Sequence, residues 1–318
     1  TIYGTPAATG TVTLSGVVTG DAVGSTASIV SPASSTSGNL RAGAYAQAAT
    51  TLNGADAGNY TLTSYTTPTL NYTVGQLALS GTAIAAAGST YGSPLNPGAV
   101  SFGNAIGGDI VGSTASVNTT TLSGSGNAIV GSYTQTAGAL VGADAANYSF
   151  GGFTSASNYT ITPLALTASS IAAVNATYGT PAATGAVALS GVVAGDTVGS
   201  TASIVSPAYS TSGNLRAGAY GQTATTLGGA DSGNYTLTPY TTPTANYTVG
   251  QLALTGGITA DNKVYDGTTA ATIASRSLTG VVGADDVSYA GGTASFAERN
   301  VGTGKAVTAS GLALAGAD

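Results

Sequence analysis

Two aspartates recur along this sequence, and paired carboxylates are the residues from which glycosidases and calcium sites are built. The first set follows glycine and the second ends a Gly-Ala-Asp segment: Asp21, Asp109, Asp196 and Asp285, then Asp56, Asp144, Asp231 and Asp318. A glycosidase needs two carboxylates in one cleft, and calcium needs six to eight oxygens, usually from carboxylates close in sequence. Each of the first three pairs is instead separated by 35 residues. We therefore expect turns in which each Asp bonds its own backbone beside glycine, with no metal site.

The composition removes most other catalytic chemistry. The 318 residues include no His, Cys, Met or Trp, and only 6% are charged. The commonest general base, the best nucleophile and the usual zinc, copper and haem ligands are thus missing. We predict no catalytic residue, no cofactor-binding residue and no cofactor. The net charge of −6 argues against nucleic acid as a partner, and no apolar run is long enough to span a membrane.

The arginine, lysine and asparagine residues suggest three further hypotheses about function. Arg41 and Arg216 stand in identical NLRAGAY segments, where we favour a structural role: the stem covers apolar surface and the guanidinium finds carbonyls or an Asp. Lys263, Asn300 and Glu298 supply the residue types of a Lys–Asn isopeptide crosslink, a weaker hypothesis. Eight Asn-X-Ser/Thr sequons occur: Asn59, Asn71, Asn118, Asn147, Asn158, Asn175, Asn234 and Asn246. For a bacterial chain we interpret them structurally, since six of them are NYT or NYS, in which an Asn turn opens a tyrosine-led strand.

A repeat organises these residues. GADAGNY at 54–60 returns as GADAANY, GADSGNY and a final GAD, at intervals of 88, 87 and 87 residues. YGTP at 3–6 returns as YGSP, YGTP and YDGT. Four copies are therefore present, the first and last incomplete, and we expect an internal fragment of a longer polypeptide.

Alternation within the copies predicts strands. Residues 3–81 and 178–256 differ at 12 positions. Thr11 and Thr13 become alanines while Val12 and the following Leu14 are kept, as in a strand with one buried face. Similar reasoning predicts strands at 27–30, 42–50, 60–65 and 72–79, with little helix. The expected fold class is all-β: a tandem array of small glycine-rich β-sandwich or β-grasp-like domains forming an elongated rod of order 100 Å.

One predicted strand changes face partway. Tyr72 and Val74 have one parity and Leu77 and Leu79 the other; in the next copy the change falls at Pro163. A slip of one residue turns side chains to the opposite face. We interpret the change as the point where one extended segment leaves one core and enters the next. It predicts domains at 1–75, 76–162, 163–250 and 251–318.

The segments KVYDGTTAAT (263–272), LTGVVGADDVSY (278–289) and AERNVGTGKAV (297–307) resemble the YDG-type repeat of large bacterial adhesins. The pattern that runs from YGTP through GADAGNYTL to NYTV is similar to the related MBG repeat. This resemblance implies long exported proteins of the filamentous-haemagglutinin and two-partner-secretion type, in which such modules are stalks or spacers. It carries no catalytic residue over to this chain.

These observations predict a structural stalk or fibre-forming region of an exported bacterial adhesin or extracellular matrix filament, not an enzyme. Its expected location is secreted, extracellular or on the cell surface, where a chain without cysteine crosses membranes unfolded and forms no disulfides. The expected partners are neighbouring repeats and other copies in a fibre. The alternative is a carbohydrate-binding adhesive module that contacts surface polysaccharide. Tyrosines packed inward would favour the stalk, and unburied aromatics in a groove would favour carbohydrate binding.

Overall fold

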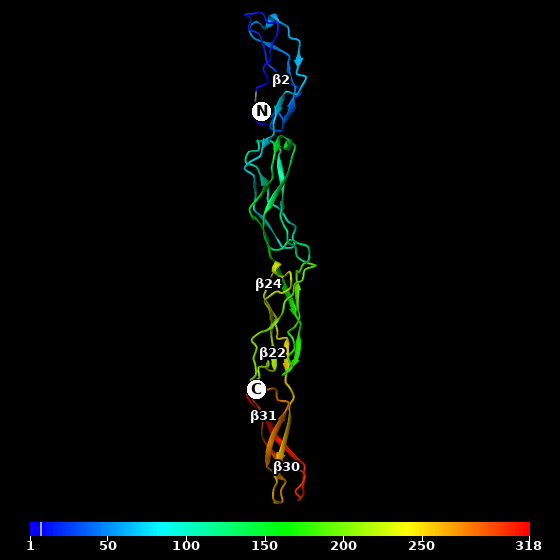
Figure 1. Ribbon diagram of the computed structural model, residues 1–318. Helices are drawn as coiled ribbons and strands as arrows, with labels where there is room; N and C mark the ends of the chain where they lie inside the picture. The colour runs from blue at the N-terminus through cyan, green and yellow to red at the C-terminus, as the bar shows by residue number, and fades with distance from the viewer. Residues whose placement is uncertain (7) are drawn as a thin grey trace. The chain divides into compact units, whose positions relative to one another are not determined.

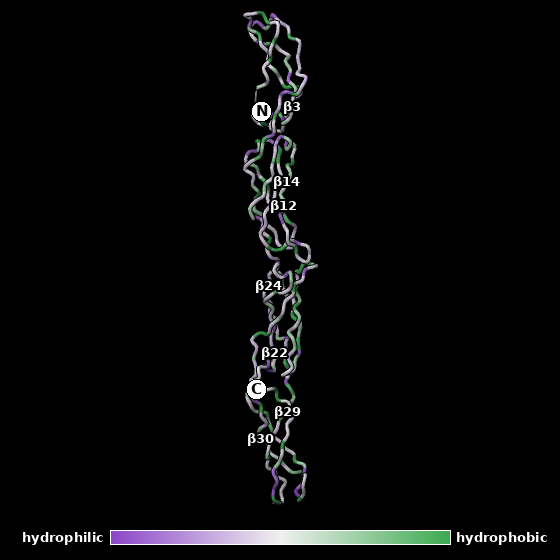
Figure 2. Tube along the Cα trace, in the orientation of Figure 1, coloured by the Kyte–Doolittle hydropathy of each residue, from purple (hydrophilic) through white to green (hydrophobic). Residues whose placement is uncertain are grey.

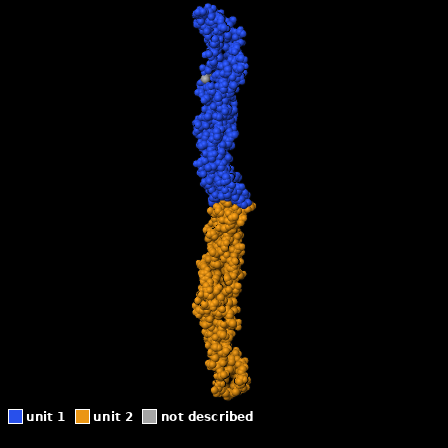
Figure 3. Space-filling model, in the orientation of Figure 1, with its two compact units in different colours: residues 1–163 blue, residues 164–318 orange. Residues whose placement is uncertain are grey.

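The structure, a computed structural model, describes residues 1–6 and 8–318. The chain divides into two compact units, Thr1–Pro163 and Leu164–Asp318 (Figure 3). Each unit holds two copies of the repeat. In the described residues helix is limited to three short 3₁₀ turns, η1 (Ala57–Asn59), η2 (Ala145–Asn147) and η3 (Ser232–Asn234), so the predicted all-β class is confirmed.

The strands of the first unit are short, as expected from a chain with glycine and turn residues at close intervals. They are β1 (Gly24–Ser25), β2 (Ser28–Ile29), β3 (Gly43–Tyr45), β4 (Gln47–Ala49), β5 (Leu52–Asn53), β6 (Tyr65–Thr66), β7 (Tyr72–Val74), β8 (Leu77–Ala78), β9 (Ala83–Ile84), β10 (Ala87–Thr90), β11 (Val100–Ser101), β12 (Gly112–Val117), β13 (Gly131–Tyr133), β14 (Gln135–Val141), β15 (Tyr148–Ser149), β16 (Phe153–Thr154) and β17 (Tyr159–Thr162). They form sheets of two or three strands, including β3-β7, β2-β4-β6, β10-β17-β13 and β12-β14-β16.

The second unit contains longer strands toward its C-terminal end. They are β18 (Leu164–Ile171), β19 (Val174–Thr177), β20 (Val187–Ser190), β21 (Ser203–Ile204), β22 (Gly218–Tyr220), β23 (Gln222–Ala224), β24 (Tyr235–Thr238), β25 (Tyr240–Thr241), β26 (Tyr247–Gly250), β27 (Thr255–Ala260), β28 (Ala270–Ala271), β29 (Ile273–Thr279), β30 (Val287–Phe296) and β31 (Val307–Gly316). The last two are the longest and pair antiparallel, side by side in Figure 1.

At residues 75–76 the sheet partner changes within the first unit, but the predicted change of core is absent, because Tyr72 and Leu77 pack against the same buried cluster. β7 pairs antiparallel with β3 of the first copy, and β8 pairs parallel with β15 of the second. At the next change, β17 pairs with β10 and β13, and β18 pairs with β20 and β24. Pro163 ends the first compact unit. The parity change therefore reports a change of sheet partner; the four-domain division stays a prediction.

Other strand predictions are correct only in part. Val12 and Leu14 are half-buried beside exposed threonines, as predicted, yet they lie outside the strands, whereas the equivalent residues form β11 in the second copy and β20 in the third. The stretch 60–64 lies outside the strands, so the predicted strand at 60–65 is wrong in the first copy. Its counterpart in the third copy, β24, is held by parallel pairing with β18, whereas no strand of the described residues pairs with 60–64.

Hydrophobic positions are spread along both units and not gathered in one segment (Figure 2). The first unit has a buried cluster of Tyr3, Val74 and Tyr148, and the second has one of Ile171, Ala202 and Ala224. The first cluster joins two copies of the repeat, since Tyr3 and Val74 belong to the first copy and Tyr148 to the second. Small cores of this kind provide modest hydrophobic stabilisation, so polar contacts matter.

A buried glutamine replaces part of the apolar core in each of the first three copies. Gln135 is completely buried; its Oε1 accepts from Gly98 N at 2.7 Å, and its Nε2 donates to Asn158 Oδ1 at 2.8 Å. The counterparts of these two residues repeat the amide pair at 2.9 Å: Gln47 with Asn71, and Gln222 with Asn246. This network was not predicted, although the glutamine stands two residues after a tyrosine in all three copies.

Candidate functional site: a carboxylate junction between repeats

The recurring aspartates first join the two ends of each copy. Asp21 accepts from Tyr60 Oη, Asp109 from Tyr148 Oη and Asp196 from Tyr235 Oη, each at 2.5 Å. The Gly-Asp segment is thereby tied to the Asn-Tyr segment 39 residues later. The tyrosine hydroxyls are thus donors that the turn interpretation did not include, and the expected bond from each Asp to its own turn stays a prediction.

The second aspartate of a copy binds both the N–H and the C=O of one residue that lies 34 positions earlier. Asp144 N donates to Ile110 O at 3.0 Å, and Asp144 Oδ2 accepts from Ile110 N at 2.9 Å. Asp144 gives no side-chain cap to the η2 turn that follows it. Gly142 explains the Gly-Ala-Asp spacing: its φ is +111°, and a Cβ there would lie 2.3 Å from Ile110 O. Only glycine permits that approach.

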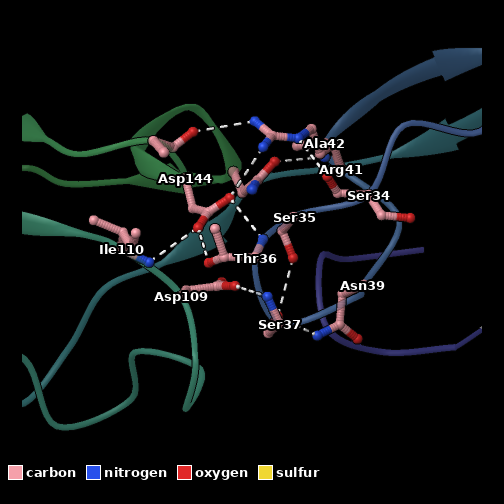
Figure 4. Close-up of polar contacts among 12 residues, drawn as sticks. Ser34, Ser35, Thr36, Ser37, Asn39, Arg41, Ala42, Asp109, Ile110 and Asp144 are labelled. Carbon is pink, nitrogen blue, oxygen red and sulfur yellow. Dashed lines mark hydrogen bonds and ion pairs between the residues drawn. The ribbon is translucent and has the colours of Figure 1, made fainter.

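Residues of the preceding copy donate to these two carboxylates in the first unit, and we call this set the carboxylate junction. Figure 4 shows Thr36, Ser37 and Arg41 around Asp109 and Asp144. Asp109 accepts from Tyr3 Oη at 2.6 Å and from Ser37 N at 3.2 Å. Asp144 accepts from the hydroxyl of Thr36, from Thr36 N at 3.3 Å and from the guanidinium of Arg41. The junction thus comprises Tyr3, Thr36, Ser37 and Arg41 from the first copy and Asp109, Asp144 and Tyr148 from the second.

Arg41 performs the structural role predicted for it. Its Nε donates to Ser34 O at 2.9 Å, its Nη1 to Ala143 O at 3.1 Å, and its Nη2 lies 3.3 Å from the buried carboxylate of Asp144. A buried carboxylate requires such compensation, because unpaired burial of charge is costly. The interpretation that the guanidinium would find carbonyls and an Asp is confirmed.

The second unit repeats the same arrangement between the third and fourth copies. Asp285 accepts from the hydroxyl of Tyr178 and from Ser212 N at 3.1 Å. Asp318 accepts from Thr211 N at 3.1 Å and forms an ion pair with Arg216 at 3.0 Å. Two places far apart in the sequence with the same partners show that the repeated segments encode contacts between copies as well as turns within them.

The electrostatics of the junction favour ionised aspartates. Burial raises the pKa of Asp109, but hydrogen bonds from Ser37, Tyr148 and Tyr3 outweigh it and hold this pKa at about 2. The pKa of Asp285 is about 2 for the same balance between burial and its Ser212 and Tyr178 bonds. Bonds from Thr36 and Ile110 lower the pKa of Asp144. Burial, with the Asp109 bond, raises the pKa of Tyr148. At neutral pH each of these carboxylates is therefore ionised and accepts hydrogen bonds from neutral hydroxyl groups.

The remaining candidates separate in the structure. Lys263 contacts the 266–270 loop, with its ammonium 2.7 Å from Asp266, while Glu298 binds Asn300 and Lys305. The structure thus gives Lys263 a partner other than Asn300 and Glu298, and the crosslink stays a hypothesis. Across residues 1–6 and 8–318, no group of three or more carboxylate, thiol or imidazole side chains could hold a metal. In that same part of the chain, no helix has the length and apolar character to cross a membrane.

The sequons fall into two classes. Asn147 and Asn234 are buried, and Asn147 Oδ1 accepts from Ala42 N of the preceding copy at 3.0 Å. Asn158 and Asn246 are half-buried in the amide network with Gln135 and Gln222. These four follow the structural interpretation. The other four, Asn59, Asn71, Asn118 and Asn175, are exposed, although Asn71 accepts from Gln47 in the same network and Asn118 donates to Thr134.

The comparisons with known proteins agree with the C-terminal resemblance. The model of the YDG domain matches residues 248–318. Neither the curated proteins nor the solved structures give a significant match to the chain. The matched region contains Asp285 and Asp318, the two carboxylates of the second junction. Residues 248–318 are thus similar to the YDG domain.

Proposed function

We propose that this chain is a non-catalytic stalk or fibre-forming region of an exported bacterial adhesin or extracellular matrix filament. The observation that carries the proposal is the carboxylate junction, in which side chains of one copy bind the half-buried Asp109 and the buried Asp144 of the next. Such contacts resist bending between consecutive copies, because separating them leaves buried charges and hydroxyls without partners. Resistance to bending is the property a stalk needs.

The YDG match supports a structural or adhesive module, and the distribution of tyrosines favours the structural one. Tyr3, Tyr91, Tyr148, Tyr159, Tyr235 and Tyr247 are buried. The carbohydrate-binding alternative would need tyrosines gathered on one open groove. In our proposal the ionisable side chains of the junction serve to bind consecutive copies to each other. The copies form a tandem array on the cell surface or in the extracellular space.

Small-angle X-ray scattering on the intact 318-residue chain tests the stalk. A compact globule of this length would have a radius of gyration of about 20 Å. A stalk of about 100 Å, the length of successive copies with strands along the axis, gives about 30 Å or more. We expect the larger value at physiological pH, independent of protein concentration. A value near 20 Å would contradict the proposal.

A matched pair of variants tests whether the carboxylate junction keeps the chain extended. Asp109→Ala removes the acceptor of Tyr3, Ser37 and Tyr148, whereas Asp266→Ala changes a carboxylate held by Lys263 in an exposed loop. We expect the first to broaden the scattering-derived distance distribution and the second to leave it unchanged. Glycan-array binding by the intact chain would instead favour the carbohydrate alternative.

A further inference from the structure

One asparagine of the chain stands directly before a glycine, the arrangement in which an asparagine side chain reacts most readily with its own backbone. In the 318 residues this pair occurs once, at Asn53 and Gly54. Asparagine is chemically labile because the amide nitrogen of the next residue can attack its side-chain carbon. Glycine has no Cβ and leaves this approach open. The first copy therefore contains a site at which the chain can modify itself.

The fold requires the glycine of this pair but not the asparagine. Gly54 has φ +106°, and a Cβ there would lie 2.2 Å from Ala22 O, so a side chain is excluded. The residue before this glycine differs in every copy: Asn53, Val141, Gly228 and Ala315. The first copy thus combines a freely variable position, occupied by asparagine, with a glycine that the backbone cannot exchange.

Both reacting groups are accessible in the folded chain. Asn53 and Gly54 are exposed, at the end of β5 and just after it. Among the residues that the structure describes, Gly54 N donates to no acceptor. Asn53 Nδ2 donates to Thr26 Oγ1 at 3.1 Å, a bond between exposed groups that water can replace. Neither burial nor backbone hydrogen bonding therefore protects the nitrogen or the side-chain carbon.

We propose that Asn53 is a self-modification site, where the chain converts an amide into a carboxylate without an enzyme. Hydroxide removes the proton of Gly54 N, and this nitrogen forms a bond to Asn53 Cγ. The Cγ–Nδ2 bond breaks, and Nδ2 leaves as ammonia with a proton from water. Water then opens the succinimide ring at either carbonyl. One opening gives an ordinary aspartate; the other gives isoaspartate, in which the main chain runs through the side chain.

Isoaspartate at this position changes the segment that binds Ala22. Asp56 N donates to Ala22 O at 3.2 Å, and Asp56 Oδ2 accepts from Ala22 N at 2.7 Å. Gly54 lies against the same carbonyl oxygen. A methylene group added to the main chain just before Gly54 must displace these contacts. The site does not depend on the stalk function, because its chemistry concerns residues of a single copy.

Peptide mapping of the intact chain after incubation at mildly alkaline pH tests the proposal. Cleavage before aspartate gives fragment 21–55, which contains Asn53 and also Asn39, followed by leucine. Exposed Asn59, followed by tyrosine, lies in fragment 56–108. We expect a gain of about 1 Da at residue 53, at least about tenfold faster than at residues 39 and 59. Equal rates at the three asparagines would overturn the proposal, as would a rate at residue 53 about a hundredfold below that in urea.

Variants at position 53 separate the reaction from the fold. Gly54→Ala cannot serve as a control, since its Cβ would meet Ala22 O. Asn53→Val introduces the residue that the second copy has at this position, and Asn53→Gln keeps an amide whose ring closure is less favourable. We expect neither variant to gain mass in fragment 21–55 faster than Asn39 does. A gain at the rate of the unchanged chain would place the reaction elsewhere and refute the site.

Amide hydrogen exchange detects the isoaspartate itself. Asn53→Asp adds the same charge without the extra methylene, so it is the matched control for the incubated chain. We expect the amides of Ala22 and Asp56 to exchange about tenfold faster in the incubated chain than in Asn53→Asp. Equal exchange in the two chains would contradict the displacement of the Ala22 contacts.

Discussion

Tyr3 and Tyr148, from consecutive copies of the repeat, donate their hydroxyls to the same oxygen of Asp109, at 2.6 and 2.5 Å. Their rings meet edge to face, at an interplanar angle of 75°, so an apolar contact and two charge-assisted hydrogen bonds coincide. Few residues then carry much of the cohesion between the copies.

Loss of this shared acceptor should destabilise the first unit. Asp109→Ala leaves two tyrosine hydroxyls and Ser37 N without their acceptor, and we expect a cost of about 2–4 kcal/mol. Asp21→Ala is the matched control, because Asp21 accepts a side-chain bond from Tyr60 in its own copy; we expect about 1 kcal/mol. Urea unfolding of the full chain measures both. Equal costs would show that the contact between copies contributes nothing.

The Gly-Ala-Asp segment should tolerate no side chain at its glycine. Gly142→Ala forces alanine to φ +111° and places its Cβ 2.3 Å from Ile110 O, so the segment must move; we expect a loss of about 2–3 kcal/mol. Gly151→Ala is the control, since no atom lies within 4 Å of the position that its new methyl group would take. Its effect should stay within about 0.5 kcal/mol. Thermal unfolding of the two variants distinguishes them.

The buried glutamine should be essential in its copy. Gln135→Ala removes the acceptor of Gly98 N and the donor to Asn158 and Ala85, and leaves a cavity, so we expect about 2–4 kcal/mol of destabilisation. Ser132→Ala, on an exposed position of β13, should change stability by less than about 0.5 kcal/mol. Guanidinium unfolding measures both variants. An unchanged free energy of unfolding in Gln135→Ala would show that the amide network does not stabilise the core.

Acid should loosen both junctions. The folded pKa values of Asp109 and Asp285 are about 2, below the unfolded value of about 3.9 for aspartate. Their contribution to stability is therefore complete above about pH 4 and is lost as the pH falls toward 2. We expect the urea midpoint of the full chain to drop through this range, with a smaller drop in Asp109→Asn. A midpoint independent of pH between about 5 and 2 would contradict the ionised junction.

The sequence predicts a β-strand correctly where one face of that strand is buried against neighbours within the same copy. The parity change between Val74 and Leu77 predicted the change of sheet partner because side-chain period and burial are directly coupled in strands. The strand at 60–65 failed in the first copy because its formation depends on a partner segment, and local alternation carries no information about that partner.

The junction could be predicted only in its parts. Arg41 is one of few cations in a chain with little charge, and the sequence predicts that its guanidinium contacts carbonyls or an Asp. The structure shows both contacts. The pairing of Tyr3 with Asp109 was not foreseen, since it joins residues 106 positions apart in different copies. The regular recurrence of both residue types could have indicated it, because the same tyrosine and aspartate are kept in every copy while Thr11 and Thr13 vary.

The spacing of the contacts between copies has a consequence for how such a gene can change length. Thr36 reaches Asp144 across 108 residues, and Tyr178 reaches Asp285 across 107. Removal or duplication of one whole period keeps this spacing between each tyrosine and an equivalent aspartate, although the second copy has Gly124 and Ile129 where the first has Thr36 and Arg41. Removal of half a period instead leaves aspartates without these donors. Whole periods are therefore the unit by which the number of copies can change with the least effect on these contacts.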